Sequence, residues 1–233
     1  MELYDYIWKR KSVRKYDMTS LDTEQLRQIT QFAERMTPLF PNIKIAYDIT
    51  ADVKALFSVK APHYFVISSE TKEGHLENVG FMFQQMDLYL SACGLGSCWL
   101  GMTKPAGKQH SELPFVIALA FGRPTESPHR KIAELKRKSL SDISSGSDDR
   151  IDAARVAPSA VNNQGWFFAA ENGSIDVFQK KPLVSPLERT GKIDIGIALS
   201  HLFVATENAG REFVFKKEAG KEKKGYIYTG TVV

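Results

Sequence analysis

The sequence repeats one helical pattern at a fixed separation, and this repeat restricts the possible folds more than any other feature. Asn78-Val79-Gly80 matches Asp194-Ile195-Gly196, and Gly94 matches Gly210, each pair 116 residues apart. Upstream, segment 33–38 mirrors segment 153–158 at an offset of 120 residues. Chance similarity between two amphipathic helices is the alternative. We instead predict a duplicated helix–strand–helix half, so that one chain imitates a dimer.

Hydrophobic spacing and turn residues predict helices and short strands in both halves. Asp22 is expected to cap the second helix, and Asn172-Gly173 to form a hairpin turn. The predicted helices cover residues 1–9, 23–36, 78–93, 149–156 and 194–209, with a short one around Lys108. The predicted strands cover residues 43–49, 64–68, 97–102, 115–121, 166–170, 174–178, 212–217 and 226–232.

These elements predict an α+β fold, with a central, mostly antiparallel sheet flanked by helices. The segment 138–149 is rich in Ser, Gly and Asp and has few apolar residues, so it is expected to be a connector. We place the two related halves at residues 1–143 and 144–233, packed together as one unit.

Composition restricts the class of partner. The 233 residues carry a net charge of +4, with 43% hydrophobic and 25% charged residues, as in ordinary globular proteins. The basic excess is dispersed among acidic residues, which favours a small anionic ligand over nucleic acid. No apolar run approaches the roughly 20 residues that span a bilayer, and the N-terminus does not resemble a signal peptide. Cys93 and Cys98 lie in an apolar stretch typical of reduced, packed thiols, so we expect a cytoplasmic protein with no membrane partner.

A basic segment near the N-terminus, Lys9-Arg10-Lys11-Ser12-Val13-Arg14-Lys15-Tyr16, supplies several cations and a hydroxyl group. Guanidinium groups bind phosphate oxygens in a bidentate manner, and serine donates a further hydrogen bond. Taken alone, the segment is more simply explained as a solvated surface turn, since most Lys and Arg residues are exposed.

A second motif lies almost 150 residues later and combines small polar residues with a large aromatic ring. It reads Ala157-Pro158-Ser159-Ala160-Val161-Asn162-Asn163-Gln164-Gly165-Trp166. Its simpler interpretation is a loop that ends a helix and is followed by a core tryptophan.

Together the two segments resemble the flavin mononucleotide (FMN) site of the nitroreductase family. Residues 10–16 are similar to the family's Arg-Arg-Ser-x-Arg-x-aromatic opening. This resemblance implies that Arg10, Lys11 and Ser12 bind the FMN phosphate and that Arg14 faces the flavin ring. A cation near the ring would stabilise the negative charge of the reduced flavin.

Residues 157–166 resemble the family's Ala-Pro-Ser-x-x-Asn-x-Gln-Pro-Trp segment, with Gly165 in place of the usual proline. The resemblance implies that Ser159 and Asn162 contact the flavin and that Gln164 braces the segment. Glycine follows the same backbone path with less rigidity, so Trp166 is held less tightly than in the family pattern.

Two further segments resemble the same family. Segment 94–102 is similar to the helix–Gly–strand passage whose backbone lies beside the flavin, which implies that Trp99, Leu100 and Gly101 line the ring. An ordinary buried strand is the alternative. Gly122-Arg123-Pro124 and the later Lys136-Arg137 are similar to the end of family chains, which implies that Lys136 and Arg137 contact the phosphate.

The motifs are divided between the two halves. The first half keeps the basic opening but has Thr37-Pro38-Leu39-Phe40 where the Pro-Ser motif belongs, and the second half has Pro158-Ser159 without a basic opening. One complete FMN site is therefore expected, in a protein that functions as a monomer.

The resemblance implies an oxidoreductase that takes hydride from NADH or NADPH and reduces a nitro-aromatic, quinone or related electrophile. The chemistry would belong to the flavin, so no catalytic side chain is expected, and the scattered histidines predict no metal site. Two other functions remain open. One is a flavin-binding or ligand-sequestering protein without turnover, and the other is a structural protein with an empty pocket.

Overall fold

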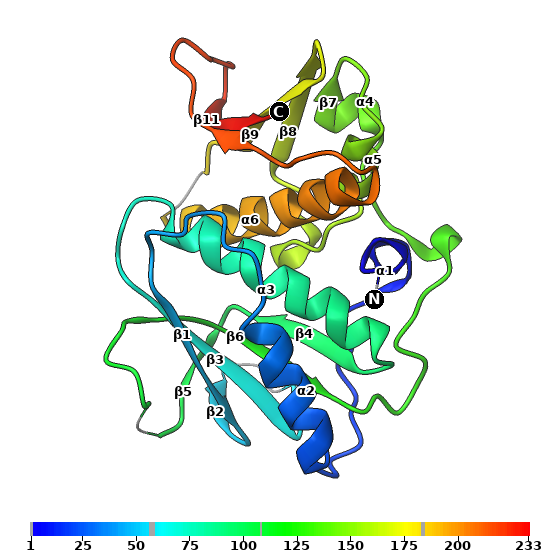
Figure 1. Cartoon of the computed structure of the whole chain (residues 1–233), viewed down its shortest axis with the longest axis vertical. Coiled ribbons are helices and arrows are strands. Elements are labelled where there is room, and N and C mark those ends of the chain that lie inside the picture. The colour runs from blue at the N-terminus through cyan, green and yellow to red at the C-terminus, as the bar shows by residue number, and fades with distance from the viewer. Residues whose placement is uncertain (1, 56–58, 108, 183–184) are drawn as a thin grey trace.

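Two long helices, α3 (His75–Ala92) and α6 (Ser185–Asn208), pack against each other in the middle of the molecule, between two main sheets (Figure 1). The computed structural model describes residues 2–55, 59–107, 109–182 and 185–233. Most side chains of α3 are buried, on all sides of the helix. A helix that is apolar all round belongs in a core, so the helix pair forms the centre of the fold.

The two helices cross at the glycines that repeat in the sequence. A Cβ atom on Gly80 would collide with the carbonyl oxygen of Ile193, and one on Gly196 would collide with that of Glu77. Glu77 and Ile193 are 116 residues apart, as are the two glycines. The contact is therefore reciprocal, as in the interface of a two-fold symmetric dimer.

The first sheet has four antiparallel strands in the order β1, β3, β6, β4. Their bounds are Ile45–Thr50 (β1), His63–Ser69 (β3), Phe115–Gly122 (β6) and Gly96–Leu100 (β4). A separate small sheet pairs β2 (Val53–Ala55) with β5 (Thr103–Pro105). The helix α2 (Thr23–Ala33) contacts α3 and begins at Asp22, whose carboxylate accepts the Gln25 N–H at 2.8 Å. The predicted cap is thus confirmed.

The second sheet has five strands in the order β10, β11, β9, β8, β7. Their bounds are Phe215–Lys216 (β10), Tyr226–Val232 (β11), Ser174–Lys180 (β9), Trp166–Glu171 (β8) and Ser144–Ser145 (β7). Only β7 and β8 pair in parallel among the described strands. The β8–β9 hairpin turns at Asn172 and Gly173, which have φ values of 51° and 80°. Such paired positive φ angles are typical of a tight hairpin turn and confirm the prediction.

Short helices complete the structure. α1 (Tyr4–Lys9) packs on α3 and α6, and α5 (Arg150–Arg155) packs on α6. The remaining short helices are α4 (Leu140–Ile143), η1 (Ile132–Glu134) and η2 (Ala160–Asn162).

The α+β architecture and the mostly antiparallel pairing confirm the predicted fold class. The strands form two main sheets where we expected one central sheet (Figure 1). A helix pair that is apolar all round needs cover on both sides, which two sheets supply. The predicted division at residue 143 falls between α4 and β7, and it stays a prediction.

Several element boundaries differ from expectation. The connector 138–149 contains α4, because Ser139 and Asp142 form a capping box that stabilises a short helix. α6 begins at Ser185, nine residues before its predicted start, where charged residues obscure the apolar pattern. α2 ends at Ala33, three residues early. The short helix expected around Lys108 lies outside the described residues.

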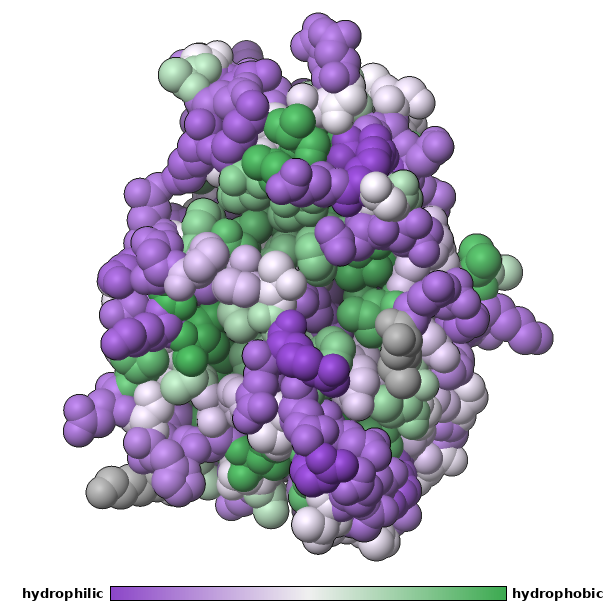
Figure 2. Space-filling model, viewed as in Figure 1, coloured by the Kyte–Doolittle hydropathy of each residue, from purple (hydrophilic) through white to green (hydrophobic). Residues whose placement is uncertain are grey.

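Figure 2 shows apolar residues gathered across the middle of one face, over the helix pair, with hydrophilic residues above and below. In the described part of the chain, no helix combines the length and the apolar character needed to cross a bilayer. Both cysteines are free. Cys98 is buried as expected, but Cys93 is exposed because it lies at the end of α3.

Candidate functional site

One cavity contacts both sequence motifs and has a volume of about 130 Å³. Ser12 and Arg14 line it from the N-terminal segment, and residues 158–161 line it from the second motif. The β4 region adds Cys98, Trp99 and Gly101. The other lining residues are Ile117 on β6 and Thr190, Ile193, Asp194 and Ile197 on α6. Segments almost 150 residues apart therefore meet in one place.

The N-terminal segment reaches the cavity by running beside β4. The Val13 N–H donates to the carbonyl oxygen of Ser97 at 2.9 Å, and Ser12 forms a parallel bridge with Ser97. A Cβ atom on Gly96 would lie only 2.6 Å from the Val13 side chain. Glycine at this position therefore permits the close approach that places Ser12 and Arg14 at the cavity.

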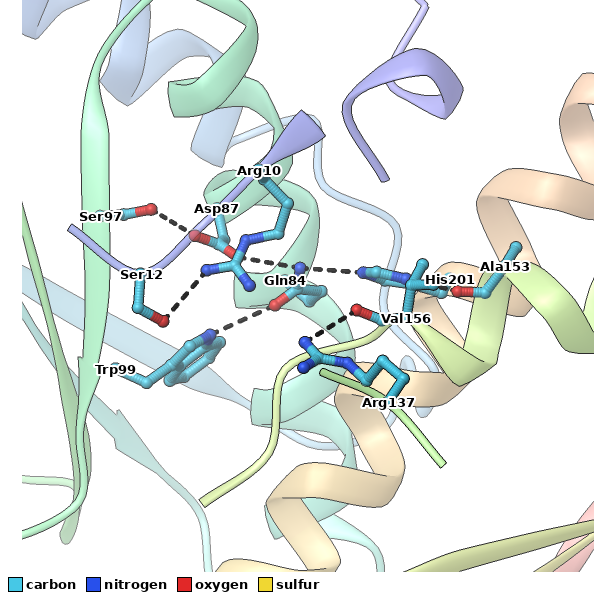
Figure 3. Close-up of polar contacts among 10 residues, drawn as sticks. All are labelled: Arg10, Ser12, Gln84, Asp87, Ser97, Trp99, Arg137, Ala153, Val156 and His201. Carbon is cyan, nitrogen blue, oxygen red and sulfur yellow. Dashed lines mark hydrogen bonds and ion pairs between the residues drawn. The ribbon is translucent and has the colours of Figure 1, made fainter. Parts of the chain in front are cut away.

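Arg10 lies beneath Ser12 and is only 1% exposed. Its Nε lies 2.9 Å from Oδ2 of the buried Asp87, and its Nη2 is 3.4 Å from Ser12 Oγ (Figure 3). The Arg10 N–H is poorly aligned for a hydrogen bond to Asp87, so this contact is mainly an ion pair. Asp87 also accepts hydrogen bonds from Ser97 Oγ and from Gln84 Nε2. These contacts fix the position of the guanidinium group.

Arg10 belongs to a cluster of three guanidinium groups with Arg130 and Arg137. Burial lowers the pKa of Arg130 to about 9 and that of Arg137 to about 10, and the charge of Arg10 is the next cause in both cases. Buried N–H groups on Arg130 (Nε and Nη2) and Arg137 (Nε) have no hydrogen-bond partner within the described structure. Clustered cations with unpaired donors are suited to an anion such as phosphate.

Arg137 links this cluster to the second motif. Its Nη1 donates to Asn162 Oδ1 at 2.8 Å. Its Nη2 donates to the carbonyl oxygen of Val156 at 3.1 Å (Figure 3). Arg137 therefore contacts Asn162 directly and lies close enough to Arg10 for the charge of Arg10 to lower its pKa.

The loop of the second motif is strained and internally braced. Val161, Asn162 and Gln164 have φ angles of 47°, 56° and 50°, a region that side chains other than glycine rarely occupy. The buried Gln164 accepts the Lys138 N–H at 2.8 Å and donates from Nε2 to the carbonyl oxygen of Asn162 at 3.1 Å. Its own N–H donates to Ser159 Oγ at 2.9 Å. Gln164 thus holds Ser159 at the cavity wall.

Trp99 is held by a chain of buried polar groups that extends to α6. Its Nε1 donates to Gln84 Oε1 at 3.2 Å, and Gln84 Nε2 lies 3.1 Å from His201 Nε2 (Figure 3). His201 Nδ1 lies 2.8 Å from the carbonyl oxygen of Ala153, so Nδ1 donates and Nε2 accepts. Burial lowers the pKa of His201 to about 3, which keeps the ring neutral.

Five of the twelve predicted site residues line the cavity, namely Ser12, Arg14, Trp99, Gly101 and Ser159. Arg10, Arg137, Asn162 and Gln164 lie outside its lining, in the cluster and the loop described above, and Lys11, Leu100 and Lys136 also lie outside it. Leu100 packs in a small core with Val13, because side chains alternate along β4 and Trp99 takes the opposite face. Trp166 is 1% exposed in the main core. The Lys136 side chain is exposed, although its carbonyl oxygen accepts from Asn162 Nδ2 at 3.0 Å. Lys11 is half-buried and does not line the cavity.

The sequence interpretation missed several residues of the site. Arg130 gave no signal, because it lies between two segments that resemble the family. Gln84 and Asp87 were detectable in principle as polar residues inside a strongly apolar helix, and buried polar groups of this kind are informative. Among the described residues, no three His, Cys, Asp or Glu side chains are grouped to hold a metal ion.

Known proteins resemble this chain in sequence and in fold. A family model described as "Putative TM nitroreductase" matches residues 2–206. A structure from Thermotoga maritima, described as a putative nitroreductase, is 24% identical; the match covers 100% of this chain and 93% of that chain, with a TM-score of 0.69. No curated protein matches the chain.

Smaller relatives match part of the chain. A nitroreductase family protein from Clostridium difficile is 18% identical and covers 64% of this chain and 99% of its own, with a TM-score of 0.51. An FMN-dependent nitroreductase from the same species is 15% identical and covers 59% of this chain and 98% of its own, with a TM-score of 0.44. The family model, by contrast, matches this chain from α1 through most of α6. Because the match covers most of its residues, this chain belongs to the nitroreductase family that the model describes.

Proposed function

We propose that this protein binds FMN and uses NADH or NADPH to reduce nitro-aromatic compounds, quinones or similar electrophiles. The observation that carries the proposal is the single cavity contacted by both motifs, beside three guanidinium groups that include unpaired donors. Family membership supports an oxidoreductase with a reductant and an acceptor.

In this proposal Arg10, Arg130 and Arg137 hold the phosphate together with Ser12. The unpaired N–H groups fit a phosphate group, whose negative charge would relieve the mutual repulsion of the cations. Lys11 and the exposed Lys136 add positive charge to the same region.

The ring would lie against Trp99, Gly101 and Ser159, with Arg14 facing it, Asn162 at its side and Leu100 contributing only its backbone. When bound, FMN supplies hydride and electron transfer, and the protein supplies position and electrostatics. A cavity of about 130 Å³ has roughly the size of one that binds benzene. The three-ring flavin is larger than this space, so part of it would extend through the opening of the cavity.

We further infer that the chain is an internally duplicated, cytoplasmic monomer with halves at 1–143 and 144–233. Asn78 Oδ1 accepts the N–H groups of Leu39 and Phe40, and Asp194 accepts the N–H of Ala160 in the same way. Phe40 and Ala160 are related by the 120-residue offset, and Asn78 and Asp194 by the 116-residue offset. Equivalent positions thus make equivalent contacts.

A second cavity of about 630 Å³ lies at the matching place in the other half. Phe40, Gly74 and Glu77 line it, and they are the counterparts of Ala160, Thr190 and Ile193 in the first cavity. The bulky Phe40 ring packs on Gly74 and against Phe215, at a centroid distance of 5.9 Å. We infer one FMN per chain, in the first cavity.

The test compares FMN with riboflavin, which lacks the phosphate. Purified protein should be yellow, release FMN on denaturation, and bind FMN at least tenfold more tightly than riboflavin, because each charged hydrogen bond contributes about 1.5–3 kcal/mol. A colourless protein that binds neither compound would contradict the proposal. Equal affinity for FMN and riboflavin would show that the arginines do not bind the phosphate.

A second candidate is a flavin-binding protein without turnover. The small volume of the first cavity favours it, since a second substrate must stack on the same flavin. Anaerobic mixing with each nicotinamide nucleotide separates the two functions. Bound FMN that stays oxidised with both nucleotides would establish the second candidate.

A further inference from the structure

The wall of the first cavity contains one buried carboxyl group, that of Asp194 on α6. The side chain is 7% exposed, and both of its oxygens accept the same Ala160 N–H, at 3.0 and 3.1 Å. This N–H is the only hydrogen-bond donor to the carboxyl among the residues that the structure describes. A carboxylate has about four acceptor positions, so one N–H leaves most of them unused.

The other half of the chain supplies an internal control for this residue. Asn78 occupies the matching position on α3 and accepts two loop N–H groups at 2.8 and 3.0 Å. Its Nδ2 also donates to the carbonyl oxygen of Phe40 at 3.3 Å. An amide therefore suffices to anchor this loop, and the half that lacks the Pro-Ser motif uses an amide. The property that distinguishes Asp194 is its ability to exchange a proton.

The surroundings of Asp194 keep its proton available near neutral pH. Burial raises the pKa of Asp194 to about 7, opposed by the hydrogen bond from Ala160. Arg14 and Cys98 are the other titratable residues that line the cavity, and burial raises the pKa of the Cys98 thiol above its ordinary value. The charged residues Lys192 on α6 and Glu77 on α3 line the second cavity instead. A group that titrates near the working pH is suited to acid–base catalysis.

We propose that Asp194 is a catalytic acid that protonates the electron acceptor, an inference that rests on the proposed function. Reduction of a quinone to a hydroquinone takes up two electrons and two protons. Bound FMN in its reduced form would supply both electrons and one proton, as a hydride equivalent. The O–H bond of Asp194 breaks to supply the second proton to the acceptor oxygen, and water then reprotonates the carboxylate.

The test uses the holoprotein and the conservative substitution Asp194→Asn, which reproduces the residue found at position 78. The expected result is unchanged FMN content and unchanged FMN reduction by the nicotinamide nucleotide. Reduction of a benzoquinone should slow by about 100-fold at neutral pH and lose its pH dependence near pH 7. The pH titration of the infrared carboxyl band should also lose one group that titrates near neutral pH, a readout independent of turnover.

Glu77→Gln is the matched control, because burial also raises the pKa of Glu77, in the second cavity. This variant should lose an infrared carboxyl band while benzoquinone reduction stays unchanged. Two results would overturn the proposal: an Asp194→Asn protein with the wild-type pH profile, or one whose only defect is weaker FMN binding. Absence of FMN from the wild-type protein would instead refute the proposed function itself.

Discussion

The two cavities at the matching ends of the α3–α6 helix pair share a frame but differ in charge chemistry. The first, which we call the flavin cavity, adjoins three clustered arginines, with Arg10 paired to the buried Asp87. The second cavity is lined by Lys72, Lys192 and Lys217, each half-exposed and paired with a glutamate. Exposed pairs contribute little, whereas buried cations with unpaired donors attract an anion strongly. Burial of charge, and not the shared helical frame, therefore distinguishes the proposed flavin site from the second cavity.

The largest expected effect concerns Asp194, the buried carboxyl in the wall of the flavin cavity. The pKa of Asp194 is about 7 in the folded protein and 3.8 in the unfolded chain, so the folded state holds the proton more tightly. The contribution of the protonated Asp194 carboxyl to the free energy of unfolding is fully present below about pH 4. It is lost as the pH rises through 7, by about 4 kcal/mol in all. In Asp194→Asn, chemical denaturation at several pH values should show a flatter profile.

Asn78→Asp reverses this comparison by adding a buried carboxyl to the other half. The free energy of unfolding of this variant should fall more steeply with rising pH than that of the wild type. If the free energy of unfolding depended on pH as in the wild type, the carboxyl at position 78 would be more accessible to solvent than that of Asp194.

The next effect concerns Asp87, whose counterpart at the 116-residue offset is Phe203. Asp87→Asn leaves the Arg10 guanidinium buried without a counter-charge, so the free energy of unfolding should fall by about 3 kcal/mol. The double variant Arg10→Met/Asp87→Leu should regain stability but not FMN binding. Thermal unfolding and flavin titration together test this, and FMN binding by the double variant would contradict it.

The glycine crossing tests the equivalence of the halves. Gly80→Ala and Gly196→Ala each place a Cβ against a backbone carbonyl, so each should lower the free energy of unfolding by about 2 kcal/mol. Gly107→Ala is the control, because among the described residues nothing beyond its chain neighbours lies within 4 Å of its Cβ position. If urea denaturation gave unequal losses of unfolding free energy for the two variants, the two glycine contacts would be equivalent in geometry but not in their contribution to stability.

Arg130→Ala tests the guanidinium cluster. Loss of charged hydrogen bonds to the phosphate should weaken FMN binding by about 1.5–3 kcal/mol, or roughly 10- to 100-fold, and leave riboflavin binding unchanged. The FMN-free protein should become more stable, since a buried cation that repels Arg10 and Arg137 is removed. Lys131→Ala, which changes an exposed neighbour of Arg130, is the control in the FMN and riboflavin titrations.

The smallest effect is expected in the second cavity. Lys217→Ala removes an exposed pair with Glu73, so stability should change by less than about 1 kcal/mol and FMN binding should not change. A loss of FMN binding would show that the second cavity also takes part in the site.

Sequence patterns predicted the Asp22 helix cap, the β8–β9 hairpin and most of the strands, because these depend on residues close together in the chain. Asp22 and Asn172-Gly173 are examples in which local hydrogen bonds and backbone preferences decide the structure. The early start of α6 escaped prediction, since packing against α3 overrides a charged first turn.

The sequence by itself determined the fold class, the repeat at 116 residues and the two motifs that contact the cavity. Only the tertiary structure decided that Arg130 joins Arg10, that Leu100 faces the core, and that Asp194 lies in the cavity wall. The physical reason is that burial and electrostatic environment depend on contacts between segments distant in the chain. Residue identity supplies the chemical group, and tertiary packing determines its solvent exposure, its partners and its pKa.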